Sequence, residues 1–273
     1  MARRDRLPPA FDALVRLRAA LADRTLFLFF DYDGTLSPIV ERPEAAVLPP
    51  AMRARLKRLV EVCFVSVISG RGLADLEERI GVAGIAYAGS HGFELVEPDG
   101  RKLENPEAQE ALPSLDSAQA ALRRHVGTID GAQLERKRFG LAVHYRRVAE
   151  ASVPEMERAV KRVLEASEGR LALKSGKKVW EFVPALDWDK GKALAWILEK
   201  SGGNTPSALP VYFGDDVTDE DAFRTVAEHG LAIAVGDGPE ETAASHRLED
   251  VEAVGMFLDA LLPRDRQHAG PDE

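Results

Sequence analysis

Two short acidic stretches, far apart in the chain, hold the side chains best suited to chemistry. The first is Asp31 and Asp33, which directly follow an unbroken apolar run at residues 26–30. Such a run predicts a strand buried on both faces, and residues two apart leave its end on the same side. The second stretch, residues 214–220, adds four more carboxylates, of which Asp215, Asp216 and Asp219 are the candidates for chemistry.

So many carboxylates would repel one another unless a cation lies between them. Carboxylate and carbonyl oxygens select hard cations, above all Mg²⁺ when a phosphate supplies further ligands. We therefore expect a nucleophile, an acid/base and a Mg²⁺ site in one place. The plainer alternatives are an Asp/Gly turn after the strand and an acidic helix start with Thr218 as its cap. Both readings can hold for different residues.

Two further polar residues lie at the predicted ends of secondary-structure elements. Ser69 ends a second predicted strand, so its hydroxyl and the neighbouring N–H groups could hold a phosphate oxygen. Alternatively, Ser69 caps the helix that begins near Gly72. Lys190 lies in the first turn of a predicted helix capped by Asp187 or Asp189. A cation there opposes the helix dipole, but both would attract the same anion.

Strands alternate with helices in the first and last parts of the chain, which predicts a doubly wound, Rossmann-like parallel sheet. In between, the order αββαββ with alternating strands predicts an inserted α+β domain. The expected fold is α/β, with core residues 1–107, an inserted domain at 108–183 and core residues 184–273. Ligands bind outside the carboxyl ends of such sheets, so the polar stretches should converge there.

Composition narrows the possible partners. The 273 residues are 45% hydrophobic and carry a net charge of −9, which argues against a nucleic-acid surface. No apolar run approaches a membrane span, and the basic N-terminus does not continue as a signal peptide. Cys63 is the only cysteine, which fits a reducing compartment. We expect a cytoplasmic monomer that acts on a small molecule.

Together these motifs resemble those of haloacid dehalogenase-superfamily phosphatases, with the inserted region similar to their large cap. More narrowly, the chain resembles the trehalose-6-phosphate phosphatases almost end to end. That likeness rests on residues 89–94, on Lys137 with residues 144–146, and on residues 176–181 and 214–220. One departure is Trp180, where the family usually has an aliphatic residue before the glutamate.

The resemblance implies a mechanism. Asp31 would attack phosphorus and form an aspartyl phosphate, while Asp33 would act as the acid and then the base. Mg²⁺ would be held by Asp31, the main-chain carbonyl of Asp33 and Asp215, with Asp216 and Asp219 as further or outer ligands. Ser69 and Lys190 would neutralise the phosphoryl oxygens.

The resemblance also implies that the cap closes and selects the sugar. Glu181 is the strongest candidate, since its side chain points away from those of Trp180 and Phe182. The other predicted sugar-binding residues are Arg71, His91, Glu94, Lys137, His144, Arg146 and Lys177.

Two other functions remain open from the sequence. The chain could hydrolyse another sugar phosphate, such as sucrose 6-phosphate, or it could be a catalytically silent sensor of sugar phosphates. Every catalytic carboxylate is present, which counts against the sensor.

Overall fold

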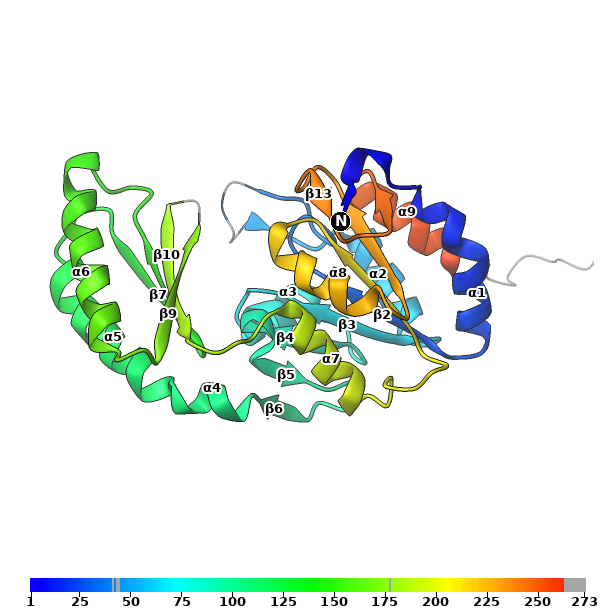
Figure 1. Cartoon of the computed structure of the whole chain (residues 1–273), viewed down its shortest axis with the longest axis horizontal. Helices are drawn as coiled ribbons and strands as arrows, with labels where there is room; N and C mark the ends of the chain where they lie inside the picture. Colours follow the sequence, from blue (N-terminus) through cyan, green and yellow to red (C-terminus); the bar gives the residue numbers. More distant parts are fainter. Residues whose placement is uncertain (41, 43–44, 177, 263–273) are drawn as a thin grey trace, which may run out of the picture.

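The computed structural model describes residues 1–40, 42, 45–176 and 178–262. Figure 1 shows a large core and a smaller cap, which lie side by side and are joined where the chain leaves β6 and returns to α7. The inserted α+β cap of the predicted fold class is thus present.

The core is built on one sheet of eight strands in the order β14-β12-β11-β2-β3-β4-β5-β6. Neighbouring strands run parallel from β14 to β4, and β5 and β6 are antiparallel. The sheet is therefore mixed, because the hairpin of β5 and β6 adds to its edge. The bounds are β2 Leu26–Phe30, β3 Phe64–Ile68, β4 Ala86–Gly89, β5 Glu94–Val96, β6 Lys102–Glu104, β11 Leu209–Gly214, β12 Leu231–Val235 and β14 His246–Leu248.

Helices cover both faces of this sheet. One face packs against α1 (Leu14–Ala22), α2 (Pro50–Leu59), α3 (Leu73–Ile80) and α9 (Val251–Leu261). The opposite face packs against α7 (Lys190–Lys200) and α8 (Glu220–Val226). In the described part of the chain, no helix is long and apolar enough to cross a membrane. The central strand β2 is covered on both sides, as its unbroken apolar run predicts.

The cap has four antiparallel strands in the order β7-β8-β10-β9. Its helices α5 (Leu112–Val126) and α6 (Val153–Ala166) pack on one face of this sheet, and Figure 1 shows the sheet on the side nearer the core. The strand bounds are β7 Gln133–Lys137, β8 Gly140–His144, β9 Leu171–Gly176 and β10 Val179–Pro184. The uncovered face is therefore free to carry polar side chains toward the core.

The structure departs from the sequence prediction at two places. Two helices, α4 (Pro106–Glu110) and α5, stand where the predicted order αββαββ opens with one, since Pro113 cannot donate to the preceding turn and would crowd its carbonyl. The short strands β1 (Ala2–Arg3) and β13 (Glu241–Thr242), which pair with each other, were not predicted.

Candidate active site

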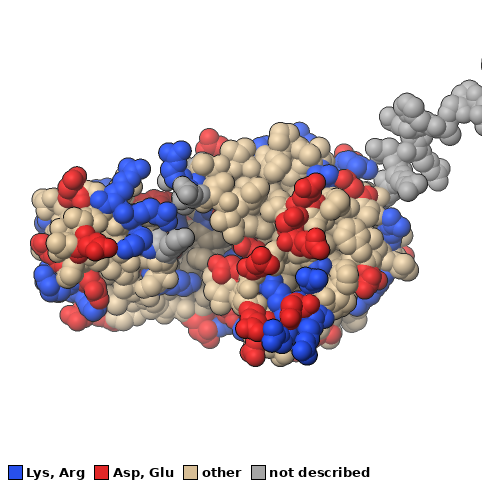
Figure 2. All heavy atoms as spheres, turned by 90° about the horizontal axis from the view of Figure 1, so that it is seen from above, with Lys and Arg blue, Asp and Glu red and all other residues tan. Residues whose placement is uncertain are grey.

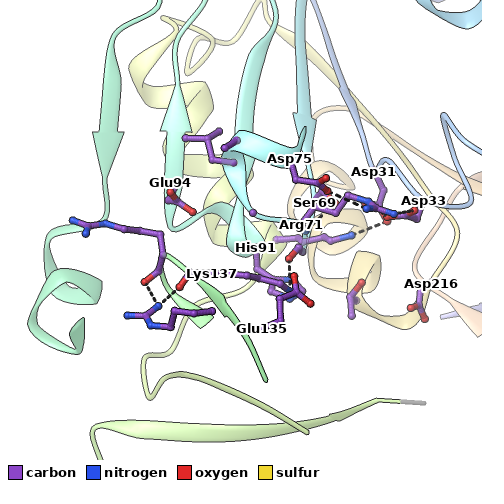
Figure 3. A pocket seen from close by; sticks show the side chains of 18 of the residues that line it. Asp31, Asp33, Ser69, Arg71, Asp75, His91, Glu94, Glu135, Lys137 and Asp216 are labelled. Atoms are coloured by element: carbon purple, nitrogen blue, oxygen red, sulfur yellow. Dashed lines mark hydrogen bonds and ion pairs between the residues drawn. The ribbon is translucent and has the colours of Figure 1, made fainter. Parts of the chain in front are cut away.

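A cavity of about 690 Å³ lies between the carboxyl end of the core sheet and the cap. The ends of β2 and β3 and the start of α7 bring the predicted chemistry to its core side (Figure 3). The predicted residues that line it are Asp31, Asp33, Ser69, Arg71, His91, Glu94, Lys137, His144, Lys190 and Asp216.

Lys190 is the cation at the centre of the acidic cluster. Its Nζ lies 2.9 Å from Oδ2 of Asp31 and 2.7 Å from Oδ1 of Asp219, and its side chain is only 3% exposed. Burial acts to lower the pKa of Lys190, but the charges of the two carboxylates outweigh it and raise the pKa. The lysine therefore stays charged, and α7 holds it in place after Asp189, whose side chain caps the helix.

Asp219 is completely buried and shapes the loop after β11. Its Oδ1 also accepts from the Tyr212 hydroxyl at 2.7 Å, and its Oδ2 accepts from the main-chain N–H groups of Asp215 and Asp216 at 3.0 Å each. Four donors thus use both oxygens. Asp219 is suited to an outer position around a metal, where it orients Lys190 and the loop.

The loop after β11 also shows whether Thr218 is the helix cap. Asp216 occupies the N-cap of the short 3-10 helix Val217–Asp219, and its side chain accepts from the Val217 N–H. Thr218 is therefore not the cap. Asp216 is exposed and lines the cavity, so its carboxylate remains open to the cleft.

The residues present fit a hard divalent cation. Carboxylate oxygens of Asp31, Asp215 and Asp219 lie within 4.8 Å of one another, and among the described residues the buried Oδ1 of Asp215 has no hydrogen-bond partner. Gly34 has a φ of 77°, and a Cβ there would lie 2.1 Å from Oδ2 of Asp215, so only glycine lets the two loops meet. Buried, unpaired carboxylate oxygens are ligands that Mg²⁺ takes.

We expect stabilisation by Mg²⁺ to grow as pH rises from about 6 to about 8. Burial, with the charge of Asp219, raises the pKa of Asp215 from 3.8 to about 7, and burial also raises the pKa of Asp31. From pH 3.8 up to about 7 the unfolded chain is ionised at this carboxyl while the folded protein still holds the proton, so the metal-free protein becomes less stable as pH rises through this range. Mg²⁺ binds the ionised carboxylates and should offset this loss.

Melting temperatures in EDTA and in saturating Mg²⁺, measured across this pH range, test the expectation. A difference between the two conditions that stays flat or shrinks as pH rises would contradict it.

Asp33 is held by an arginine that was predicted to bind substrate. Nε and Nη2 of Arg71 donate to the two carboxylate oxygens of Asp33 at 2.7 Å each, and Nη1 donates to Asp75 at 3.0 Å. Burial acts to lower the pKa of Arg71, while both carboxylates raise it. The partner of Arg71 is therefore Asp33, the residue predicted to act as acid and base.

Ser69 is buried at the end of β3, and its Oγ accepts from the main-chain N–H of Arg71 at 3.2 Å. Helix α3 takes Gly72 as its N-cap, so the alternative role of Ser69 as a helix cap is wrong. This leaves the serine O–H able to donate to a phosphate oxygen in the cleft.

Two ion pairs lie on the cap, and three of their members, Glu135, Lys137 and His144, line the cavity. Nζ of Lys137 lies 2.8 Å from Oε1 of Glu181, and it also donates across to the main-chain oxygen of Gly70 in the core at 3.4 Å. Nε2 of His144 lies 2.9 Å from Glu135. The sequence analysis missed Glu135, although its two-residue spacing from Lys137 on β7 puts both on one face.

The next two predicted residues lie against the core. The His91 ring packs so closely on Gly70 that a Cβ there would lie 2.7 Å from its Cε1, and burial lowers its pKa. Glu94 is buried and accepts from the Ser90 hydroxyl at 2.8 Å, and burial raises its pKa. His91 is therefore neutral and rigidly placed, and Glu94 has a protein partner.

Arg146 lines an adjoining cavity of about 740 Å³ rather than the catalytic one. Lys177 lies outside the described residues. Figure 2 shows Lys and Arg side chains gathered on the part of the cap that borders the core. The basic side chains around the adjoining cavity are Arg42, Arg71, Arg79, Arg146, Arg147 and Lys178.

The core sheet with its inserted cap is a fold that this chain shares with a haloacid dehalogenase-like hydrolase. A haloacid dehalogenase-like hydrolase from Bacteroides thetaiotaomicron shares the fold at 16% identity, with a TM-score of 0.62 over 86% of this chain and 98% of that one. The family model for trehalose-phosphatase matches residues 29–252. The chain belongs to the trehalose-phosphatase family.

Named relatives are similar over most of the chain. The trehalose-phosphate phosphatase of Mycobacterium tuberculosis (strain H37Rv) is 45% identical over 272 residues, which span 97% of this chain and 68% of that protein. The same-named protein of Mycobacterium marinum is 44% identical over 259 residues, 93% of this chain and 66% of that protein. The C-terminal domain of Candida albicans trehalose-6-phosphate phosphatase shares the fold at 23% identity, with a TM-score of 0.72 over 93% of this chain and 97% of that one.

Proposed function

We propose that the protein hydrolyses trehalose 6-phosphate to trehalose and phosphate, through an aspartyl phosphate on Asp31 and with Mg²⁺ bound. The observation that carries the proposal is the pair of buried ion pairs that Lys190 makes with Asp31 and Asp219. They lie beside Asp215 at the base of a polar cleft. Membership of the trehalose-phosphatase family and the named activity of the mycobacterial relatives support the substrate.

In the first step, Asp31 attacks phosphorus and the bond from phosphorus to the sugar oxygen breaks. Asp31 is preset for this, because Oδ1 accepts from the Tyr32 N–H at 2.7 Å and Oδ2 lies 2.9 Å from Lys190. Lys190 and the Ser69 hydroxyl neutralise the phosphoryl oxygens. Bound Mg²⁺, held by Asp31, Asp215 and the Asp33 carbonyl, would supply further charge stabilisation.

Asp33 acts as the general acid and then as the general base. It gives one to the leaving sugar oxygen, and it later takes one from the water that attacks phosphorus and frees Asp31. A carboxylate that accepts two hydrogen bonds from Arg71 carries no proton to give. Asp33 must therefore leave this pair before it acts as the acid, which makes the described arrangement a resting one.

The cap would bind the sugar and select it. Trehalose offers hydroxyl groups, and the facing strands present two carboxylates, Glu135 and Glu181, with Lys137 and His144 between them. Carboxylates accept from hydroxyls and lysine donates to them with useful directionality.

We expect Glu181→Ala to lower kcat/KM for trehalose 6-phosphate by about ten- to a hundredfold, because the substrate hydroxyls and Lys137 lose a half-buried partner. Hydrolysis of 4-nitrophenyl phosphate, which makes no sugar contacts, should hardly change. Glu157→Ala is the matched control, since that cap carboxylate pairs with Lys161 on α6. An equal fall with both substrates would mean that Glu181 supports the fold or the chemistry instead.

Phosphate release from trehalose 6-phosphate, sucrose 6-phosphate and glucose 6-phosphate, with and without EDTA, tests the function. We expect release from trehalose 6-phosphate alone, and none after chelation. Preference for sucrose 6-phosphate would support the alternative phosphatase, and binding without release would support the silent sensor. The cytoplasmic location and the monomeric state stay predictions.

A further inference from the structure

An arginine near the N-terminus is buried behind the acidic cluster. The strand β1 pairs with β13, and the Arg4 N–H donates to the main-chain oxygen of Glu240 at 2.9 Å. This pairing turns the Arg4 side chain inward, and the residue is only 6% exposed. Arginine is rarely buried so deeply unless its charge and donors are matched.

The Arg4 guanidinium joins the loops that follow two neighbouring core strands. Nε donates to the main-chain oxygen of Gly236 at 2.9 Å, and Nη2 donates to that of Val235, both at the end of β12. Nη2 also reaches the main-chain oxygen of Asp215 at 3.5 Å, at the end of β11. Asp215 is the carboxylate whose Oδ1 is buried without a partner.

The surroundings of Arg4 are acidic, and its contacts are with main-chain atoms. Burial lowers the pKa of Arg4, while the charges of Asp215, Glu220, Asp237 and Asp219 oppose that shift. Arg4 thus acts on the position of the loop at Asp215, because it binds the carbonyl groups that fix the path of the chain there.

We propose that Arg4 is a positioning residue for the metal site: it anchors the Asp215 loop so that the carboxylates of Asp215, Asp31 and Asp219 stay together, and thereby strengthens Mg²⁺ binding. The inference rests on the Mg²⁺ site of the proposed function. Two physical effects oppose each other here. A nearby guanidinium repels a divalent cation, whereas a fixed ligand loop strengthens binding. The sign of the change in affinity after removal of Arg4 decides which effect dominates.

The test is calorimetric titration of metal-free protein with MgCl₂. We expect Arg4→Gln to raise the Kd for Mg²⁺ by about tenfold or more, and Arg4→Lys to restore part of the affinity. Arg3→Gln is the matched control, because the Arg3 side chain is 51% exposed and pairs only at the surface with Asp5 and Glu240. The KM for the sugar phosphate at saturating Mg²⁺ should not change in any of these variants.

A second variant disturbs the same contact without removing the charge. A Cβ at Gly238 would lie 2.0 Å from Nη1 of Arg4 and 2.2 Å from the Asp215 carbonyl oxygen, so Gly238→Ala should weaken Mg²⁺ binding in the same direction. The melting temperature of metal-free Arg4→Gln shows whether that variant folds. If it does not, the Mg²⁺ affinity of Gly238→Ala decides the test.

Unchanged or tighter Mg²⁺ binding in Arg4→Gln or Gly238→Ala would overturn the positioning role of Arg4 and leave the proposed function standing. Absence of Mg²⁺ binding by the wild-type protein would overturn the metal site of the proposed function as well. A rise in KM for the sugar phosphate at saturating Mg²⁺ would show a general structural defect and would also overturn the inference.

Discussion

Replacement of Asp31 with asparagine should abolish phosphate release and leave the protein folded. Loss of the attacking oxygen should lower kcat by at least about 10⁴-fold, as with nucleophiles of other covalent mechanisms. The fold should survive because Lys190 keeps its 2.7 Å partner Asp219. One fewer charge also relieves repulsion between Asp31 and Asp215.

Circular dichroism, the melting temperature and phosphate release on the purified variant check this prediction. Asp221→Asn is the matched control, because that carboxylate pairs with Arg224 at the surface and not with the cluster. Turnover near the wild-type level would remove Asp31 as the nucleophile.

Replacement of Lys190 with methionine should damage both stability and catalysis. It leaves the buried carboxylates of Asp31 and Asp219 without their shared cation, which costs about 3–5 kcal/mol when one partner of a buried ion pair is removed. Turnover should fall by about 10²–10³-fold or more, since a charge aimed at the phosphoryl group is lost.

Urea denaturation in EDTA gives the free energy of unfolding, and phosphate release gives the rate. Lys192→Met on the same helix is the control, because Lys192 pairs with Asp187 at the surface. A Lys190→Met protein as stable as this control would show that the central cation is dispensable to the fold.

The carboxylates of the candidate site could be predicted from the sequence because their signal is local. An unbroken apolar run that stops at Asp31 and Asp33 has few explanations other than a buried central strand and a site at its end. The same holds for Lys190, since a cation in the first turn of a helix is unfavourable unless an anion faces it.

The partners of these residues could not be predicted, because they depend on how distant segments meet. Arg71 lies two residues from Ser69 in the chain, yet its partner is Asp33, on the neighbouring strand's end. Arg4 has no periodic pattern around it, and its contacts at Val235 and Gly236 depend on a two-residue strand too short to leave a sequence signal. Register likewise decides that Lys137 meets Glu181.

The place of β2 in the sheet has a consequence for how the protein is made on the ribosome. β2 pairs on one side with β3, which follows soon after it, but on the other with β11, which emerges only after the whole cap. Asp31, the proposed nucleophile, depends on that late partner, since its N–H donates to the Phe213 carbonyl oxygen at 2.9 Å. The cap strands, by contrast, are contiguous and can pair early. During synthesis the half-built core therefore exposes an unpaired apolar strand edge, a target for chaperones, and the candidate active site cannot form until β11 has emerged.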